Sequence, residues 1–225
     1  MSAYFVTATG TDIGKTFVTR GLLRALRAGG RHAEAIKPIM SGFEPAAAAE
    51  SDAGLLLAAA GRPVTLELIS LISPWRFAAP LAPDMAAARE GRTVDFRELT
   101  EFCQASIVSI RGVLLIEGAG GVMSPINAEQ TVLDWIARLE LPVVLVAGSY
   151  LGTISHTLTA LDAIARRGLK VIAVVISETA GSPVRLDETR DAIARFAPHV
   201  DVVALPRLAA AAPDHSVFDR IAAGL

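Results

Sequence analysis

Residues 4–16, YFVTATGTDIGKT, constrain this chain more than any other segment, because an apolar strand pattern runs directly into a loop of small and hydroxyl residues. Small residues let main-chain N–H groups close around phosphate oxygens, and Lys15 can reach the terminal phosphates of a nucleotide. Thr16 offers a hydroxyl to Mg2+ and opens a predicted helix, whose N-terminal dipole favours anions. The segment therefore predicts a phosphate-binding loop.

Coincidence is a poor explanation of the Gly14-Lys15-Thr16 triplet. The chain contains only three lysines, so about 0.03 such triplets are expected by chance. The loop departs from the Gly-x4-Gly-Lys-Ser/Thr pattern at one position, since Thr9 stands where the first glycine is expected and Gly10 follows it.

Composition limits the class of protein. The 225 residues are 52% hydrophobic, which predicts one globular domain over residues 1–225. A formal net charge of -2 gives no electrostatic reason to expect nucleic acid or an anionic membrane as a partner. The N-terminus lacks a basic leader and the apolar runs are strand-sized, so we expect a cytoplasmic protein. The single cysteine, Cys103, has apolar neighbours and is predicted to be an inert core thiol.

Short β-branched runs alternate with longer helical patterns along the chain. This alternation predicts an α/β fold of the P-loop NTPase type, with a doubly wound, mostly parallel sheet and helices on both faces. The predicted strands are residues 4–8, 32–36, 113–117, 143–147, 171–176 and 202–205. The predicted helices are residues 15–28, 52–60, 96–110, 131–139, 153–167 and 186–196.

In such a sheet, the residues just past the carboxyl ends of the strands carry the chemistry. Glu117 ends the most apolar strand pattern and runs into Gly118, Ala119 and Gly120. An acid at this point beside a phosphate loop is where Mg2+ is usually held, and an ion-paired strand-end carboxylate is the alternative. Lys37 follows another predicted strand, and in a chain with so few lysines it is a candidate for phosphate chemistry rather than for solvation.

Several short motifs occur in an order typical of one family. They are YFVTATGTDIGKT (4–16), KPIMSG (37–42), SD (51–52), FAAPLAP (77–83), IEGAGGVMSP (116–125), LGTISH (151–156) and LPRL (205–208). With these motifs the chain resembles, over nearly its whole length, the dethiobiotin synthetases, ATP-dependent enzymes of biotin synthesis. The implied reaction converts 7,8-diaminopelargonate and CO2 to a carbamate, phosphorylates the carbamate with ATP, and closes a cyclic urea with loss of phosphate.

The resemblance implies catalytic roles for three residues. Lys15 would neutralise the β and γ phosphates, and Lys37 would stabilise the carbamate and the phosphoryl group in transfer. Thr11 would position the reacting end of the diamine, together with Ser41 as a substrate-binding residue. Phosphoryl transfer depends mainly on positioning and charge neutralisation, which these residue types suit.

The resemblance also implies the metal and nucleotide sites. Thr16, Asp52 and Glu117 would bind Mg2+, the cofactor, with ATP as co-substrate. At the position that recognises the adenine base, related enzymes usually have an asparagine, whereas this chain has Ser177. This difference predicts weaker discrimination between ATP and other triphosphates. The remaining nucleotide contacts would be Asp12, Ile13, Gly14, Lys15, Phe17, Gly118, Ala119, Gly120, Pro206, Arg207 and Leu208.

The far carboxylate of the diamine needs a partner of its own. The start of the helix at residues 152–155 offers free N–H groups and two hydroxyls. The resemblance implies that Gly152, Thr153 and Ser155 come from the neighbouring subunit of a homodimer. Ser155 stands at a position where members of the family have an asparagine.

Other classes of protein share the predicted architecture. A partition-type switch ATPase has a second lysine five residues before the lysine of the Gly-Lys pair, where this chain has Gly10. A glutamine amidotransferase needs a nucleophilic cysteine in a further domain, and Cys103 has no such context. A nucleotide-binding regulator without chemistry stays open at this point.

Overall fold

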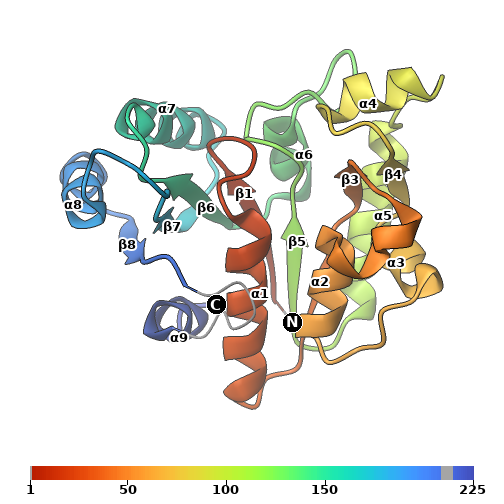
Figure 1. Cartoon of the computed structure of the whole chain (residues 1–225), viewed down its shortest axis with the longest axis horizontal. Coiled ribbons are helices and arrows are strands. Elements are labelled where there is room, and N and C mark those ends of the chain that lie inside the picture. The colour runs from red at the N-terminus through yellow and green to blue at the C-terminus, as the bar shows by residue number, and fades with distance from the viewer. Residues whose placement is uncertain (1, 209–214) are drawn as a thin grey trace.

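The computed structural model describes residues 2–208 and 215–225, and a six-stranded parallel sheet forms its centre (Figure 1). The strand order is β2-β5-β1-β6-β7-β8, which is the doubly wound arrangement that the sequence predicts. The strands are β1 (Ser2–Ala8), β2 (Ala33–Ile36), β5 (Val113–Glu117), β6 (Val143–Gly148), β7 (Val171–Ser177) and β8 (Asp201–Leu205).

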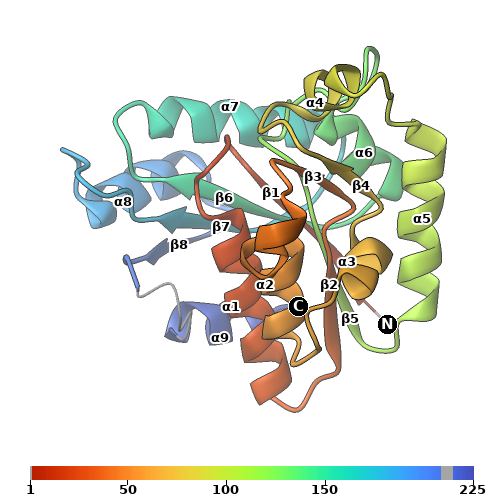
Figure 2. The same cartoon turned by 45° about the vertical axis from the view of Figure 1, so that its right-hand side comes forward.

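Helices cover both faces of the sheet, because alternate side chains of each strand point to opposite faces. From β1, Tyr4 and Val6 belong to a core with α1, α2 and α9, whereas Phe5 points to the core on the other face. Phe5 packs edge-on against Trp135 of α6, with ring centroids 4.9 Å apart. Figure 2 shows the sheet between α1 and α2 on one side and α5 and α6 on the other.

The six predicted helices are all present, with ends that differ by at most one residue. The observed bounds are α1 (Lys15–Ala28), α2 (Asp52–Ala59), α5 (Phe96–Ser109), α6 (Val132–Leu139), α7 (Thr153–Arg166) and α8 (Leu186–Phe196). Burial raises the pKa of the Cys103 thiol on α5 to about 12, which agrees with an inert core cysteine. No helix in the described ranges is both long and apolar enough to span a bilayer.

Several short elements were not predicted. The pair β3 (Ile39–Ser41) and β4 (Trp75–Phe77) forms a small parallel sheet, and α4 (Pro83–Arg89) packs against both strands. These elements lie together beside the carboxyl end of β5 (Figure 1), where they can wall a site. The others are the 3-10 helix η1 (Pro45–Glu50), α3 (Leu66–Ile72) and α9 (Ser216–Ala222).

The helix α9 explains a glycine inside α1. A Cβ on Gly21 would lie 2.4 Å from the ring of Phe218, which is 1% exposed. Because only glycine leaves room for this ring, α9 packs directly on the helix that follows the phosphate loop.

Candidate active site

The phosphate loop connects β1 to α1 and turns through two left-handed residues. Asp12 has φ 56° and Gly14 has φ 97°. Gly14 caps α1 without a side-chain hydrogen bond, so no side chain occupies the first N–H groups of the helix. Free N–H groups at a helix N-terminus form a site for anions.

The strand register brings the next two site residues together. β2 lies beside β5 with Ile36 opposite Ile116, so the residues that follow, Lys37 and Glu117, emerge side by side. β5 also pairs with β1, which places Glu117 beside the phosphate loop. Both predicted strand-end residues therefore meet at the carboxyl edge of the sheet, as expected of this fold.

Lys37 is held by three oxygen atoms. Its Nζ lies 2.7 Å from Glu117 Oε1 and 3.0 Å from Asp52 Oδ2, and it donates to the carbonyl oxygen of Gly118 at 3.0 Å. Thr16 Oγ1 lies 2.8 Å from Asp52 Oδ1 and 2.7 Å from Glu117 Oε1. One connected network is thus formed by four predicted site residues that are far apart in the sequence: Thr16, Lys37, Asp52 and Glu117.

Burial and neighbouring charges set the protonation of this network. Burial lowers the pKa of Lys37, but the carboxylates of Glu117 and Asp52 outweigh it, so that the pKa lies above its ordinary value. Burial raises the pKa of Asp52, and Lys37 outweighs this to keep it below the usual range. The pKa of Lys15 is lowered to about 8, first by burial and then by the Lys37 charge, although Glu117 and Asp52 oppose this.

The donor set suits a magnesium ion that shares its ligands with a bound phosphate. Glu117 Oε2 is buried and has no hydrogen-bond partner among the described residues. The described residues contain no group of three or more His, Cys, Asp or Glu side chains that could hold a metal by themselves. Mg2+ is commonly bound by one or two carboxylates plus substrate phosphates and water, so Thr16, Asp52 and Glu117 fit this ion.

A cavity of about 630 Å3 opens over the network. Lys15, Thr16, Lys37 and Asp52 line it, and so do Thr11, Asp12, Gly14, Phe17, Ser41, Ala119 and Gly120. The other residues that line it received no role from the sequence, although residues 80–83 belong to a quoted motif. They are Ile39, Pro80, Leu81, Ala82, Pro83 and Ser124.

A second cavity of about 410 Å3 adjoins the first on the other side of the loop. The two share Asp12, Gly14 and Phe17. The second is lined by five more predicted nucleotide contacts and by three residues that received no role from the sequence, Glu178, Thr179 and Ala180, whereas Glu117 and Gly118 line neither cavity. The predicted contacts are Ile13, Ser177, Pro206, Arg207 and Leu208.

The start of α7 lies outside both cavities. Thr153 is buried and donates its hydroxyl to the carbonyl oxygen of Gly148 at 2.7 Å, whereas Ser155 is exposed. Gly152, with φ 98°, begins the helix without a side-chain cap. A single chain therefore does not bring the three predicted carboxylate-binding residues to the lysines.

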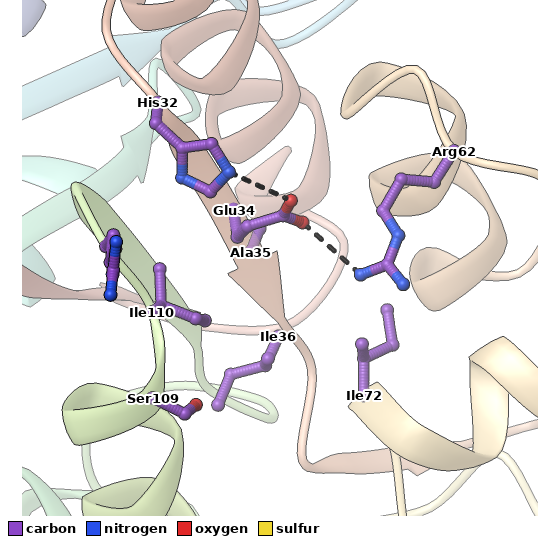
Figure 3. Close-up of a pocket in the computed structure, with 9 residues that line it drawn as sticks. His32, Glu34, Ala35, Ile36, Arg62, Ile72, Ser109 and Ile110 are labelled. Atoms are coloured by element: carbon purple, nitrogen blue, oxygen red, sulfur yellow. Dashed lines mark ion pairs between the residues drawn. The ribbon is translucent and has the colours of Figure 1, made fainter.

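A further hollow is lined by residues of β2 and by residues 109–111, which precede β5 (Figure 3). Glu34 lies 3.9 Å from His32 and 3.6 Å from Arg62, and it points between them. Its carboxylate faces both basic groups, so Glu34 pairs with both of them. None of the predicted site residues lines it.

Comparison with known proteins agrees with this geometry. A family model described as an AAA domain matches residues 2–215. An ATP-dependent dethiobiotin synthetase from Acidiphilium cryptum is 50% identical over 87% of this chain and 88% of its own length. The synthetases of Methylobacterium nodulans and Phenylobacterium zucineum are 51% and 48% identical, over 88% and 99% of this chain and 90% and 96% of theirs.

Solved structures show a similar fold at low identity. The septum site-determining protein MinD of Pyrococcus horikoshii, complexed with Mg-ADP, covers 98% of this chain and 94% of its own with a TM-score of 0.59 and 16% identity. MinD of Aquifex aeolicus covers 98% and 86%, with a TM-score of 0.53 and 12% identity. At these identities the likeness confirms the predicted P-loop NTPase fold alone.

If Asp52 helps to hold Mg2+, its neutral isostere should weaken the metal site without unfolding the protein. We predict that Asp52→Asn raises the Mg2+ concentration for half-maximal ATP turnover by about tenfold or more, because one anionic ligand is lost. The melting temperature should change little, since the Asp52 side chain is 39% exposed and Lys37 keeps Glu117 as a partner.

The matched control is Glu50→Gln, which neutralises an exposed carboxylate two residues away. It should leave the Mg2+ requirement unchanged. An Asp52→Asn protein with the wild-type Mg2+ requirement would remove Asp52 from the metal site.

Proposed function

The chain belongs to the ATP-dependent dethiobiotin synthetase family, and on that premise we propose that it makes dethiobiotin from 7,8-diaminopelargonate, CO2 and ATP. Relatives of this name are about half identical to it over most of both chains. The convergence of Lys15, Lys37, Asp52 and Glu117 beneath one cavity carries the proposal. We place the reaction in the cytoplasm and on one domain, as the sequence predicts.

A switch ATPase of the partition type shares the fold but receives less support. MinD structures resemble this chain at 16% identity or less in the two cases described, which bears on fold alone. The chain also has Gly10 in the part of the loop where a switch ATPase carries a second lysine. The relatives of high identity are synthetases, so we favour the synthetase.

The first step forms a carbamate. One amine of the substrate attacks CO2, a C–N bond forms, and the amine loses a proton. Thr11 and Ser41 line the cavity, and the hydroxyl of Ser41 is buried without a partner among the described residues. We assign both hydroxyls to holding this end of the diamine, and we assign the Lys37 ammonium to stabilising the new negative charge.

The second step transfers the γ-phosphoryl group. A carbamate oxygen attacks the γ phosphorus, the bond to the β-phosphate oxygen breaks, and ADP leaves. Lys15 and the N–H groups at the start of α1 would hold the phosphates in place. Mg2+, held by Thr16, Asp52 and Glu117, would neutralise the charge on the β and γ phosphates. An anion beside Lys15 would raise its lowered pKa and keep the side chain charged.

The last step closes the ring. The second amine attacks the carbonyl carbon of the carbamic-phosphoric anhydride, the bond from this carbon to the phosphate oxygen breaks, and a proton leaves the amine. Lys37 would stabilise the departing phosphate. Residues 80–83 line the cavity and would limit the water that could hydrolyse the anhydride.

Turnover of ATP with and without the diamine tests the proposal. We predict that ADP release by the wild-type protein requires both diamine and bicarbonate and yields one dethiobiotin per ADP. Lys37→Gln should lower kcat by about thirty- to a thousandfold, because a single donor to a transition-state charge supplies about 2–4 kcal/mol.

Lys170→Gln, which changes an exposed lysine at the amino end of β7, is the matched control and should turn over normally. The melting temperature of each variant separates lost chemistry from lost folding, since Lys37 also pairs with a buried carboxylate. ATP hydrolysis that ignores the diamine would favour a switch ATPase instead.

We also propose that the active sites are shared between the two subunits of a homodimer. The start of α7 offers uncapped N–H groups to the far carboxylate of the diamine, yet it lies outside the cavity of its own chain. The adjoining Leu151 side chain is 77% exposed, which favours a partner at this point. Gly152, Thr153 and Ser155 would then complete the site of the other subunit.

Mixing two inactive variants tests the shared site. Lys15→Ala should abolish phosphoryl transfer, and Ser155→Trp should block the carboxylate site while fitting the free chain, because Ser155 is exposed on α7. After subunit exchange, heterodimers contain one site with neither lesion, so we predict recovery of about a quarter of wild-type activity. No recovery after verified exchange would place each site within one chain.

A further inference from the structure

The cavity around Ser177 is also lined by Glu178, whose carboxylate has no role in the proposed function. This cavity of about 410 Å3 shares Asp12, Gly14 and Phe17 with the cavity around Lys15, so a nucleotide with its phosphates on the loop can extend its base into it. Its apolar lining suits the faces of a base and comes from Ile13, Phe17, Pro206 and Leu208.

Three main-chain N–H groups at the polar side of this cavity already have acceptors. Glu178 N donates to a carbonyl oxygen of β8 at 2.9 Å, and Thr179 N donates to Ser149 Oγ at 2.9 Å. Arg207 N donates to Glu178 Oε2 at 2.8 Å. These groups are therefore not free to donate to N1 of an adenine ring.

The Glu178 side chain is positioned by one of these bonds and keeps capacity to accept more. Its Oε2 is fixed by the Arg207 N–H, and its Oε1 has no hydrogen-bond partner in the described part of the chain. A carboxylate accepts hydrogen bonds and does not donate them. Ser177 Oγ, the neighbouring hydroxyl, also has no partner there and can donate or accept.

This arrangement of acceptors and donor matches guanine better than adenine. Guanine presents two adjacent donors, N1–H and the N2 amino group, and next to them the acceptor O6. A carboxylate can accept from both donors while a hydroxyl donates to O6. Adenine presents an acceptor, N1, beside its amino group, and N1 would face the negative charge of Glu178 without a donor.

We propose that Glu178 is a specificity-determining residue that makes this enzyme accept guanine nucleotides, with a Kd for GTP within about tenfold of that for ATP. The proposal rests on the proposed function in that GTP would replace ATP as phosphoryl donor at the same site. Lys15 and Thr16 are assigned to the phosphates and not to the base, so either triphosphate could place its phosphates on them.

Direct binding of GTP, ITP and ATP by calorimetry, without diamine, tests this selectivity. We expect ITP, which lacks the 2-amino group, to bind about tenfold more weakly than GTP. Glu178→Gln keeps an acceptor for the Arg207 N–H and adds a donor for adenine N1, so it should shift the GTP/ATP affinity ratio toward ATP by about ten- to a hundredfold.

The matched control is Glu188→Gln, which neutralises an exposed carboxylate on α8 outside the cavity and should leave the ratio unchanged. A wild-type preference for ATP above about tenfold, or a ratio that Glu178→Gln does not move, would overturn the proposal. Because binding is measured without diamine, a failure to form the cyclic urea would count against the proposed function alone.

Discussion

A buried ion pair between Lys37 and Glu117 organises this site. Lys37 is 4% exposed and Glu117 is fully buried, and such charges are tolerated in a protein interior only when they are paired and hydrogen-bonded. The pairing of β2 with β5 makes the contact possible, because it places Lys37, which follows β2, next to Glu117, which ends β5. Removing either partner would leave a buried charge, so the site and the local fold depend on the same contact.

The charges in the network around this pair balance, but one of its carboxylate oxygens has no partner among the described residues. Lys15 and Lys37 offset Asp52 and Glu117, while Glu117 Oε2 has no partner among the described residues. The cost of burial is visible in the Lys15 pKa, which is lowered to about 8. A nucleotide phosphate and Mg2+ would supply what is missing, an anion for Lys15 and a cation for the free carboxylate oxygen. The site is thus prepared for a charged ligand rather than for stability alone.

The sequence predicted the elements with strong local signals and missed those without them. The helix α1 (Lys15–Ala28) was predicted with both ends correct, because glycines flank a clear helical pattern. The three-residue strand β3 (Ile39–Ser41) was missed, since three residues give no measurable alternation. Lys37 and Glu117 were both predicted as strand-end site residues, but their direct contact depends on which strands are neighbours, and that is a tertiary property. Glu178 was missed for the same reason, because only the fold brings it to the Arg207 N–H and into the cavity around Ser177.

The proposed function depends most on the transfer of one phosphoryl group to a carbamate above the Lys37–Glu117 pair. Turnover with 18O-labelled bicarbonate, followed by mass spectrometry of the released phosphate, tests it most directly. If a carbamate oxygen attacks the γ phosphorus, that oxygen leaves with the phosphate, so each phosphate should carry one atom of label when the bicarbonate is fully labelled. Phosphate without label, released together with dethiobiotin, would show that the carbamate is never phosphorylated and would contradict the account.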